Sequence, residues 1–288
     1  MKKIEVVVII FVIVGTSTIF QSNNIFAKDF SMHEALSKGL IKLNLSSTGG
    51  HSENCMAVKV QNLGSNALNL YLEPGYILDN LDDHQQDIIV VKSLKIKLNP
   101  HQKIDTVAYG FCCQSHNASP KTGQKFRLGK MADTLMVKLC HYINNHKVNA
   151  GAAQSAVWTI SNKHHLATIG QPKDTSMIEL IKICNRNNNV ALPWFYVGYS
   201  NIPGLVFSNI PCKVVLNFEY NKKSNKQLTI SIYDQSGHKI KTLLANSFAS
   251  PGLKSFHYDF DIVNWKKGVY TLKVKELNQE PISKTFEF

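Results

Sequence analysis

The stretch Leu228-Thr-Ile-Ser-Ile-Tyr-Asp234 decides the fold of the C-terminal third of the chain. Apolar and polar residues alternate in it with the period of a β-strand, so its leucine and isoleucines share one face. Similar alternating segments lie on both sides of it, at residues 214–220, 239–244, 254–260, 269–274 and 282–288. Turn-forming residues such as Pro251-Gly252 separate these segments. Six or seven short strands in about 85 residues predict an immunoglobulin-like β-sandwich.

The same alternation marks the N-terminal half of the chain. Met56, Val58 and Val60 alternate with polar neighbours, and leucines do so at 68, 70 and 72. Further strands are predicted at residues 88–91, 94–98 and 104–111. Strands at this spacing, with turn residues between them, predict an antiparallel β-sandwich.

Helical patterns flank and follow these strands. Ser31-Met-His-Glu34 and Ser176-Met-Ile-Glu179 have the spacing of a capping box, and each precedes apolar residues at helical spacing. Residues 115–129 read as a polar loop, after which the apolar residues of 131–143 and 153–160 indicate two more helices. The predicted fold class is therefore mainly β, with an N-terminal β-sandwich that carries a small helical cap and a C-terminal immunoglobulin-like sandwich.

Residues 1–27 have the three parts of a secretory signal peptide. Lys2 and Lys3 precede the apolar run 6–14, and Ile25-Phe26-Ala27 ends in a small residue suited to cleavage. An uncleaved N-terminal anchor is the alternative. No later segment is long enough to span a membrane, so we expect a secreted or outer-surface protein without a transmembrane helix after cleavage. The predicted limits are 1–27 for the signal, 28–200 for the first domain, 201–204 for a linker and 205–288 for the second domain.

The formal net charge is +12, from 32 basic and 20 acidic residues, but only Arg127 and Arg186 are arginines. Recognition of phosphates and base edges favours the guanidinium group, and the lysines here are scattered rather than clustered with aromatic residues. We therefore expect no nucleic-acid partner. No phosphate loop, dinucleotide fingerprint or zinc-binding spacing occurs in the sequence, so we expect neither a cofactor nor a metal site.

All six cysteines follow the signal segment, at positions 55, 112, 113, 140, 184 and 212. An oxidising compartment would permit up to three disulfides, with about fifteen possible connectivities. The adjacent Cys112 and Cys113 are expected to face opposite ways on a strand rather than to bond to each other.

The C-terminal segment carries a set of ordered positions: Ile230-Ser-Ile-Tyr-Asp234, Gly237, Pro251-Gly252, Gly268-Val-Tyr270 and a closing Lys284. This pattern resembles the C-terminal sorting domain of type IX secretion cargo in Bacteroidota. The resemblance covers about residues 205–288 and implies a tail that the type IX secretion machinery reads as an address. The Pro-Asn-Pro opening common in that family is absent, and Asn209-Ile-Pro211 stands roughly in its place. A generic immunoglobulin-like spacer is the alternative.

Two segments of the first domain resemble the Cys and Gln motifs of bacterial thioester domains. They are Tyr109-Gly-Phe-Cys112-Cys113 and Ala153-Gln154-Ser-Ala-Val-Trp158. The resemblance implies that a cysteine thiolate attacks the Gln154 carboxamide, releases ammonia and leaves an acyl thioester for a surface nucleophile. The alternative is structural: the cysteine is a small core residue or half of a disulfide, and Gln154 and Trp158 pack one helical turn apart.

Three functions compete for the first domain. It is a non-enzymatic adhesion or binding domain for an unknown extracellular ligand, a covalent adhesin that uses Cys112 or Cys113 with Gln154, or a cysteine hydrolase or transferase. The last would use one of the same cysteines as nucleophile, with a base drawn from His116, His141 or His146. We adopt the first interpretation, a type IX cargo that is not an enzyme.

Overall fold

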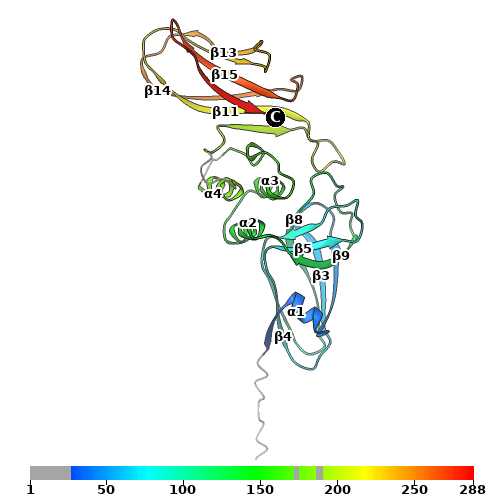
Figure 1. Ribbon diagram of the computed structural model, residues 1–288. Helices are drawn as coiled ribbons and strands as arrows, with labels where there is room; N and C mark the ends of the chain where they lie inside the picture. The colour runs from blue at the N-terminus through cyan, green and yellow to red at the C-terminus, as the bar shows by residue number, and fades with distance from the viewer. Residues whose placement is uncertain (1–26, 172–174, 186–190) are drawn as a thin grey trace, which may run out of the picture.

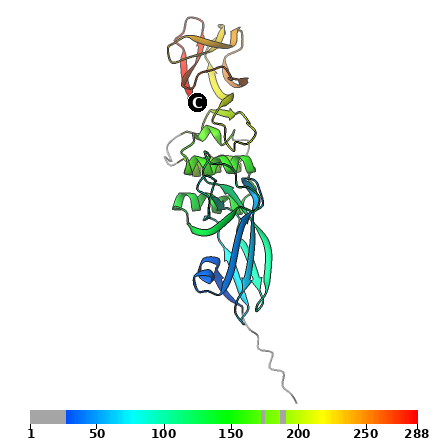
Figure 2. The same ribbon diagram turned by 90° about the vertical axis from the view of Figure 1, so that its right-hand side faces the viewer.

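The computed structural model describes residues 27–171, 175–185 and 191–288, so the predicted signal peptide lies outside the described residues except for Ala27. The described chain is mainly β, as predicted. A β-barrel, a layer of helices and a C-terminal pair of sheets follow one another along one long axis (Figures 1 and 2). Within these residues, no helix has the length and apolar character needed to cross a membrane.

The elements fall into three groups in chain order. Those of the barrel region are β1 (Lys28–Ser31), α1 (Met32–Ser37), β2 (Ile41–Ser47), β3 (Ser52–Asn62), β4 (Leu68–Leu72), β5 (Tyr76–Asn80), β6 (Ile88–Val90), β7 (Leu94–Leu98), β8 (Lys103–Cys112) and β9 (Lys125–Met131). Those of the helical layer are α2 (Thr134–Asn145), α3 (Ala150–Ser161), the 3-10 helix η1 (Leu166–Thr168) and α4 (Thr175–Cys184). Those of the C-terminal sheets are β10 (Phe195–Tyr199), β11 (Pro211–Lys222), β12 (Leu228–Tyr233), β13 (Lys239–Ser247), β14 (Gly252–Asp261), β15 (Val269–Glu276) and β16 (Ile282–Glu287).

Six strands close into a barrel in the order β2-β3-β8-β6-β5-β9, where the sequence predicted stacked sheets. β9 closes the ring because Phe126 pairs with Leu45 of β2 and Leu128 pairs with Leu78 of β5. The predicted polar loop 115–129 was therefore wrong from residue 125 onward, where β9 begins. Only two large apolar residues of β9 turn inward between basic ones, which is too short an alternation to stand out in the sequence.

A smaller sheet, β1-β4-β7, lies at the N-terminal end of the barrel together with α1. The Ser31 side chain accepts a hydrogen bond from the Glu34 backbone N–H at 3.0 Å, which confirms the predicted N-cap of this helix. Met32 and Ala35 are buried against the barrel core. The N-terminal segment is thereby fixed to the barrel.

The three helices of the layer pack against one another and bury a shared apolar core. Asp133 and Asn149 cap α2 and α3 by accepting backbone N–H bonds at 2.9 and 3.1 Å. α3 is buried along most of its length because it contacts both β8 and its neighbouring helices. The helices predicted from apolar spacing are thus confirmed, and they form a layer over one end of the barrel.

The C-terminal part forms two antiparallel sheets, β10-β11-β14 and β13-β12-β15-β16, around one core. Leu228, Ile230 and Ile232 are buried in this core, as their alternation predicted. β10 pairs with β11, so by its pairing this strand belongs to the C-terminal sheets, although the sequence placed it within the first domain. Two layers of antiparallel strands agree with the predicted sandwich, while the immunoglobulin-like designation stays a prediction.

A buried ion pair lies at one end of these sheets. The side chains of Lys222 and Glu276 are both fully buried, and their charged atoms lie 4.0 Å apart. The Glu276 carboxylate also accepts hydrogen bonds from the Tyr220 hydroxyl and the Lys223 N–H, each at 2.8 Å, and from the Ser224 hydroxyl. Burial alone would raise the pKa of Glu276, but these hydrogen bonds and the lysine charge lower it to about 2.

Replacing the carboxylate of this pair tests its contribution to stability. Glu276→Gln leaves Lys222 charged and buried without its counter-ion, so the free energy of unfolding should fall by about 3–5 kcal/mol. Since the folded pKa lies below the ordinary value of 4.5, the stabilisation by the native carboxylate is complete above pH 4.5. This stabilisation is lost as the pH falls toward 2. Glu276→Gln has no carboxylate to protonate at this position, so it should not show this loss. Urea unfolding followed by tryptophan fluorescence measures both effects, with the exposed Glu280→Gln as control. Equal stability of the two variants would contradict the assignment.

Candidate functional site

β8 delivers the two adjacent cysteines to the junction between the barrel and the helical layer. Cys112 packs in the barrel core and Cys113 packs in the core of the helical layer, so the two face opposite ways, as predicted. Gly110 of the same strand lies so close to β6 that a Cβ atom there would be 2.5 Å from Ile88 Cγ2. β8 also contacts α3, so the strand end that carries the cysteines lies against this helix.

Gln154 of α3 reaches back to this strand end. Its carboxamide Oε1 accepts a hydrogen bond from the Cys112 N–H at 3.1 Å, and its Nε2 donates to the Cys112 carbonyl at 2.8 Å. The Gln154 side chain is buried, with 5% of its surface exposed. The structure therefore brings together the two segments that the sequence singled out, 42 residues apart in the chain. Both hydrogen bonds that join the two segments involve backbone atoms of Cys112.

Five of the six cysteines are buried in apolar surroundings. All six are free. Burial raises the pKa of Cys112 and of Cys113 well above the ordinary range of a thiol, and raises that of Cys140 to about 12. A thiolate is the reactive form of cysteine, so these positions are poor nucleophiles as they stand. The disulfides that the sequence allowed are not formed.

The histidines named as candidate bases lie elsewhere. His141 and His146 are exposed on α2 and at its C-terminus, and His146 Nδ1 lies 2.9 Å from the Tyr142 carbonyl oxygen. His116 is exposed in the segment after β8. Within the described ranges, no hydrogen bond joins any of the three to Cys112 or Cys113, so the structure does not assemble the predicted cysteine–histidine pair.

A different histidine, which the sequence analysis did not single out, meets a serine near this strand end. His164 Nε2 lies 2.9 Å from Ser115 Oγ, and burial lowers the pKa of His164. The Ser115 backbone N–H donates to Asn162 Oδ1 at 3.0 Å. No sequence spacing signals this contact, because the two residues are 49 positions apart and meet only when α3 packs on β8.

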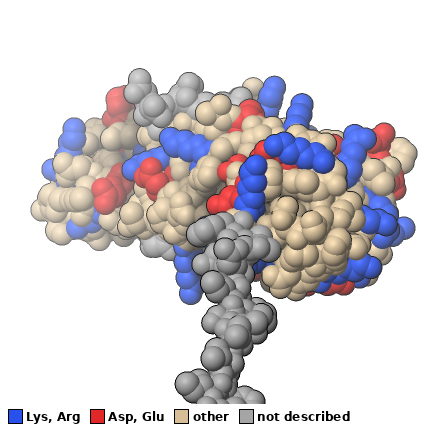
Figure 3. Space-filling view, turned by 90° about the horizontal axis from the view of Figure 1, so that it is seen from below, with Lys and Arg blue, Asp and Glu red and all other residues tan. Residues whose placement is uncertain are grey.

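On the face that Figure 3 presents, basic side chains are spread out rather than gathered in one stripe. Figure 3 shows Lys and Arg scattered over the face that it presents, with acidic side chains among them. Several lysines are engaged locally, such as Lys59 with Asp105 at 3.0 Å and Lys213 with Asp259 at 2.8 Å. On this face the charge has the distribution of a solvated surface.

The positions that carry the resemblance in the C-terminal sheets have defined structural roles. Gly237 has a φ of +83° in the turn after β12, where its N–H donates to the Asp234 carbonyl at 3.0 Å. Gly268 opens β15, and its N–H donates to the Phe288 carbonyl at 2.9 Å. The ammonium of Lys284 lies 5.4 Å from the ring centroid of Trp194, just before β10. The last strand is thus fastened both to β15 and to the segment that enters the sheet.

Residues 209–286 match the family of secretion system C-terminal sorting domains. The segment from just before β11 into β16 is therefore a sorting domain, as predicted. It makes the chain a cargo of the type IX secretion system, secreted or held at the cell surface, and implies recognition by that machinery. No curated protein and no solved structure matches the chain. The resemblance of the first domain to thioester domains stays a prediction.

Removing the Gln154 carboxamide tests the junction between helix and barrel. Gln154→Leu keeps the size of the side chain but loses both hydrogen bonds to Cys112, so the free energy of unfolding should fall by about 1–3 kcal/mol. Thermal and denaturant unfolding measure this loss. Ser155→Ala, one position along the same helix, is the control and should change stability by less than about 0.5 kcal/mol. If the two variants prove equally stable, the carboxamide does not hold the layers together.

Proposed function

We propose that the protein is delivered outside the cell by its sorting domain and acts there as a non-enzymatic binding protein. The observation that carries the delivery step is the match of residues 209–286 to the sorting-domain family. The predicted signal peptide at residues 1–27 would supply the first step of export, across the inner membrane. The sorting domain then supplies the second step, across the outer membrane.

The proposal of a binding role rests on the first domain. Its conspicuous cysteines are buried, and their raised pKa values keep them protonated at neutral pH. Its barrel and helical layer have tightly packed cores, which suit a rigid scaffold for recognition. These features favour binding without chemistry over the cysteine hydrolase.

Delivery can be tested in a host that has a type IX secretion system. Removing residues 209–288 should leave the chain in the periplasm, whereas the full chain should reach the cell surface or the medium. A reporter protein that carries residues 1–27 at its start and 205–288 at its end should follow the full chain. Immunoblots of cell fractions make the comparison, with a strain that lacks the secretion system as control. Export of the shortened chain, or retention of the reporter, would contradict delivery by the tail.

One observation favours a second function, that of a covalent adhesin. The Gln154 carboxamide is held against the backbone of Cys112 in a place that excludes water, and a thioester needs such shelter from hydrolysis. In that reaction the sulfur of Cys112 or Cys113 bonds to the Gln154 amide carbon. The carbon–nitrogen bond breaks, and the thiol proton leaves with the nitrogen as ammonia.

The mass of the intact protein separates the two functions. Binding without chemistry predicts the full mass of the processed chain and six thiols after unfolding, one for each cysteine. A thioester would lower the mass by about 17 Da, consume one of the six thiols and leave five, and methylamine would restore an amide at Gln154. We expect the full mass and six thiols, with Gln154→Leu as the control that cannot form the bond. A mass deficit that appears in the native chain but not in Gln154→Leu would overturn the non-covalent interpretation.

A further inference from the structure

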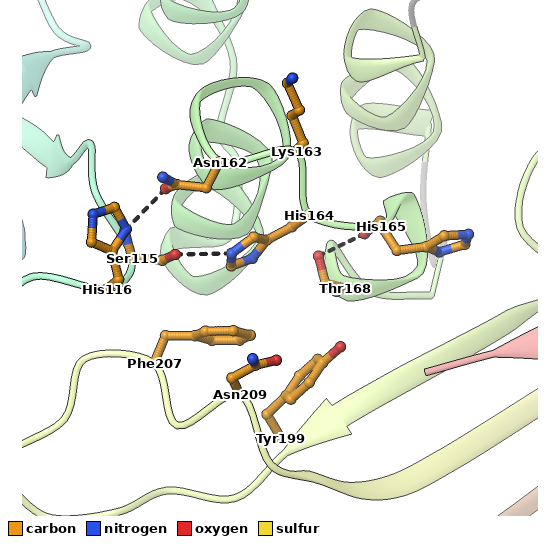
Figure 4. A pocket seen from close by; sticks show the side chains of 10 residues that line it. All are labelled: Ser115, His116, Asn162, Lys163, His164, His165, Thr168, Tyr199, Phe207 and Asn209. Atoms are coloured by element: carbon orange, nitrogen blue, oxygen red, sulfur yellow. Dashed lines mark hydrogen bonds between the residues drawn. The ribbon is translucent and has the colours of Figure 1, made fainter. Parts of the chain in front are cut away.

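A cavity of about 400 Å³ lies between the end of α3 and the loop 200–210, which leads into the sorting domain. Figure 4 shows the side chains of the helical layer on one side of it and those of the loop on the other. Its lining combines aromatic rings with short polar groups, and it consists of Ser115, His116, Asn162, Lys163, His164, His165, Thr168, Tyr199, Phe207 and Asn209. The volume lies within the range of small-molecule sites, about 300–1,000 Å³.

Among the described residues, the buried polar atoms without a hydrogen-bond partner include two in this region: one belongs to His164 in the cavity lining, and the other to Trp158, whose ring neighbours that of His164. His164 bonds to Ser115 through Nε2, but its Nδ1 is buried and unpaired. The Nε1–H of Trp158 is also buried and unpaired, and the two rings have centroids 5.9 Å apart. A buried indole N–H normally finds an acceptor, and even the half-buried Trp194 donates its own N–H to the Thr285 carbonyl, 3.2 Å away. A polar group bound at this place would pair atoms that the described residues leave unpaired.

The ring of Phe207 packs against the aromatic rings at this site. Its centroid lies 4.5 Å from that of His164, 5.7 Å from that of Trp158 and 4.7 Å from that of Tyr199. These distances are those of stacked and tilted aromatic contacts. A phenylalanine ring has no polar atom, so it satisfies the shape of the site and leaves both nitrogen atoms unpaired.

The loop that carries Phe207 is closed on itself. The Ser200 N–H donates to the Ile210 carbonyl at 2.9 Å, and the Leu205 N–H donates to the Ile202 carbonyl at 3.0 Å. Among the residues that the structure describes, no hydrogen bond joins loop 200–210 to the helical layer. Leu205 and Ile210 are 54% and 47% exposed, whereas Phe207 is half-buried and its ring contacts that of His164. Lifting its ring from the cavity breaks no hydrogen bond between the two parts.

We propose that this cavity binds a phenolic ring and that Phe207 covers it as an internal occupant. The ring of the ligand takes the place of Phe207 against His164 and Tyr199. The hydroxyl oxygen of the ligand accepts a hydrogen bond from the Trp158 Nε1–H. Its hydroxyl proton, or a second oxygen atom of the ligand, forms a hydrogen bond with the His164 imidazole or with Ser115. The proposal names a ligand class for the binding role proposed above and rests on that role, while delivery by the tail does not depend on it.

The test compares 4-methylphenol with toluene, which has the same ring and methyl group but no hydroxyl. Each is titrated into the full processed chain and into its Phe207→Ala variant, and the indole N–H signals are followed by ¹H–¹⁵N NMR. In the variant, 4-methylphenol should shift the Trp158 signal saturably and leave that of Trp194 unmoved. It should bind at least about tenfold more tightly to the variant than to the native chain, because Phe207 no longer competes. It should also bind at least about tenfold more tightly than toluene, because only the phenol pairs the buried N–H.

Two further variants make the result decisive. Leu205→Ala alters an exposed side chain of the same loop and should bind 4-methylphenol as the native chain does. Phe207→Leu keeps an apolar contact and should fall between the native chain and Phe207→Ala, so the trend stands even if the alanine variant folds poorly. Absence of a Trp158 shift, equal affinity for the two probes, or equal affinity of the native and variant chains would overturn the proposal. None of these results would bear on secretion of the full chain, which the fractionation experiment measures separately.

Discussion

Two hydrogen bonds between the Gln154 carboxamide and the backbone of Cys112 join the helical layer to the barrel. They lie where β8 ends and where the next residue, Cys113, turns into the helical core. Both layers meet at this short stretch, so these bonds contribute to holding α3 against the barrel. The end of α3 leads toward η1, and the ring of His165, just before η1, stacks on Phe195 of β10 at 5.3 Å. Because β10 pairs with β11, the first domain contacts the C-terminal sheets through this strand.

Strands in which apolar and polar residues alternate over several positions could be predicted from the sequence. The regularly spaced apolar residues around Ile230, for example, identify a strand with one buried face. The barrel could not, because its closing strand turns only Phe126 and Leu128 inward. The proximity of the cysteine and glutamine motifs was predicted from family resemblance. The contact of Ser115 with His164 was not, since neither residue stands in a recognisable motif and only tertiary packing brings them together.

The sorting domain and the cavity proposed to bind a ligand occupy different parts of the chain, and the loop 200–210 lies between them. The sorting domain begins within this loop, at residue 209, and the ring of Phe207 precedes it by two positions. The same segment therefore leads to the address and covers the cavity of the first domain. The contact of Phe207 with His164 thus connects the segment that leads into the sorting domain with the proposed binding cavity.

Native-state hydrogen exchange of the full chain tests most directly whether the junction at Gln154 unites barrel and helices. The account predicts that the amides of β8 and α3 open together with one free energy, while those of β12 and β15 open with a separate one. Exchange of α3 amides under conditions in which β8 stays protected would contradict it, because the helical layer would then open without the barrel.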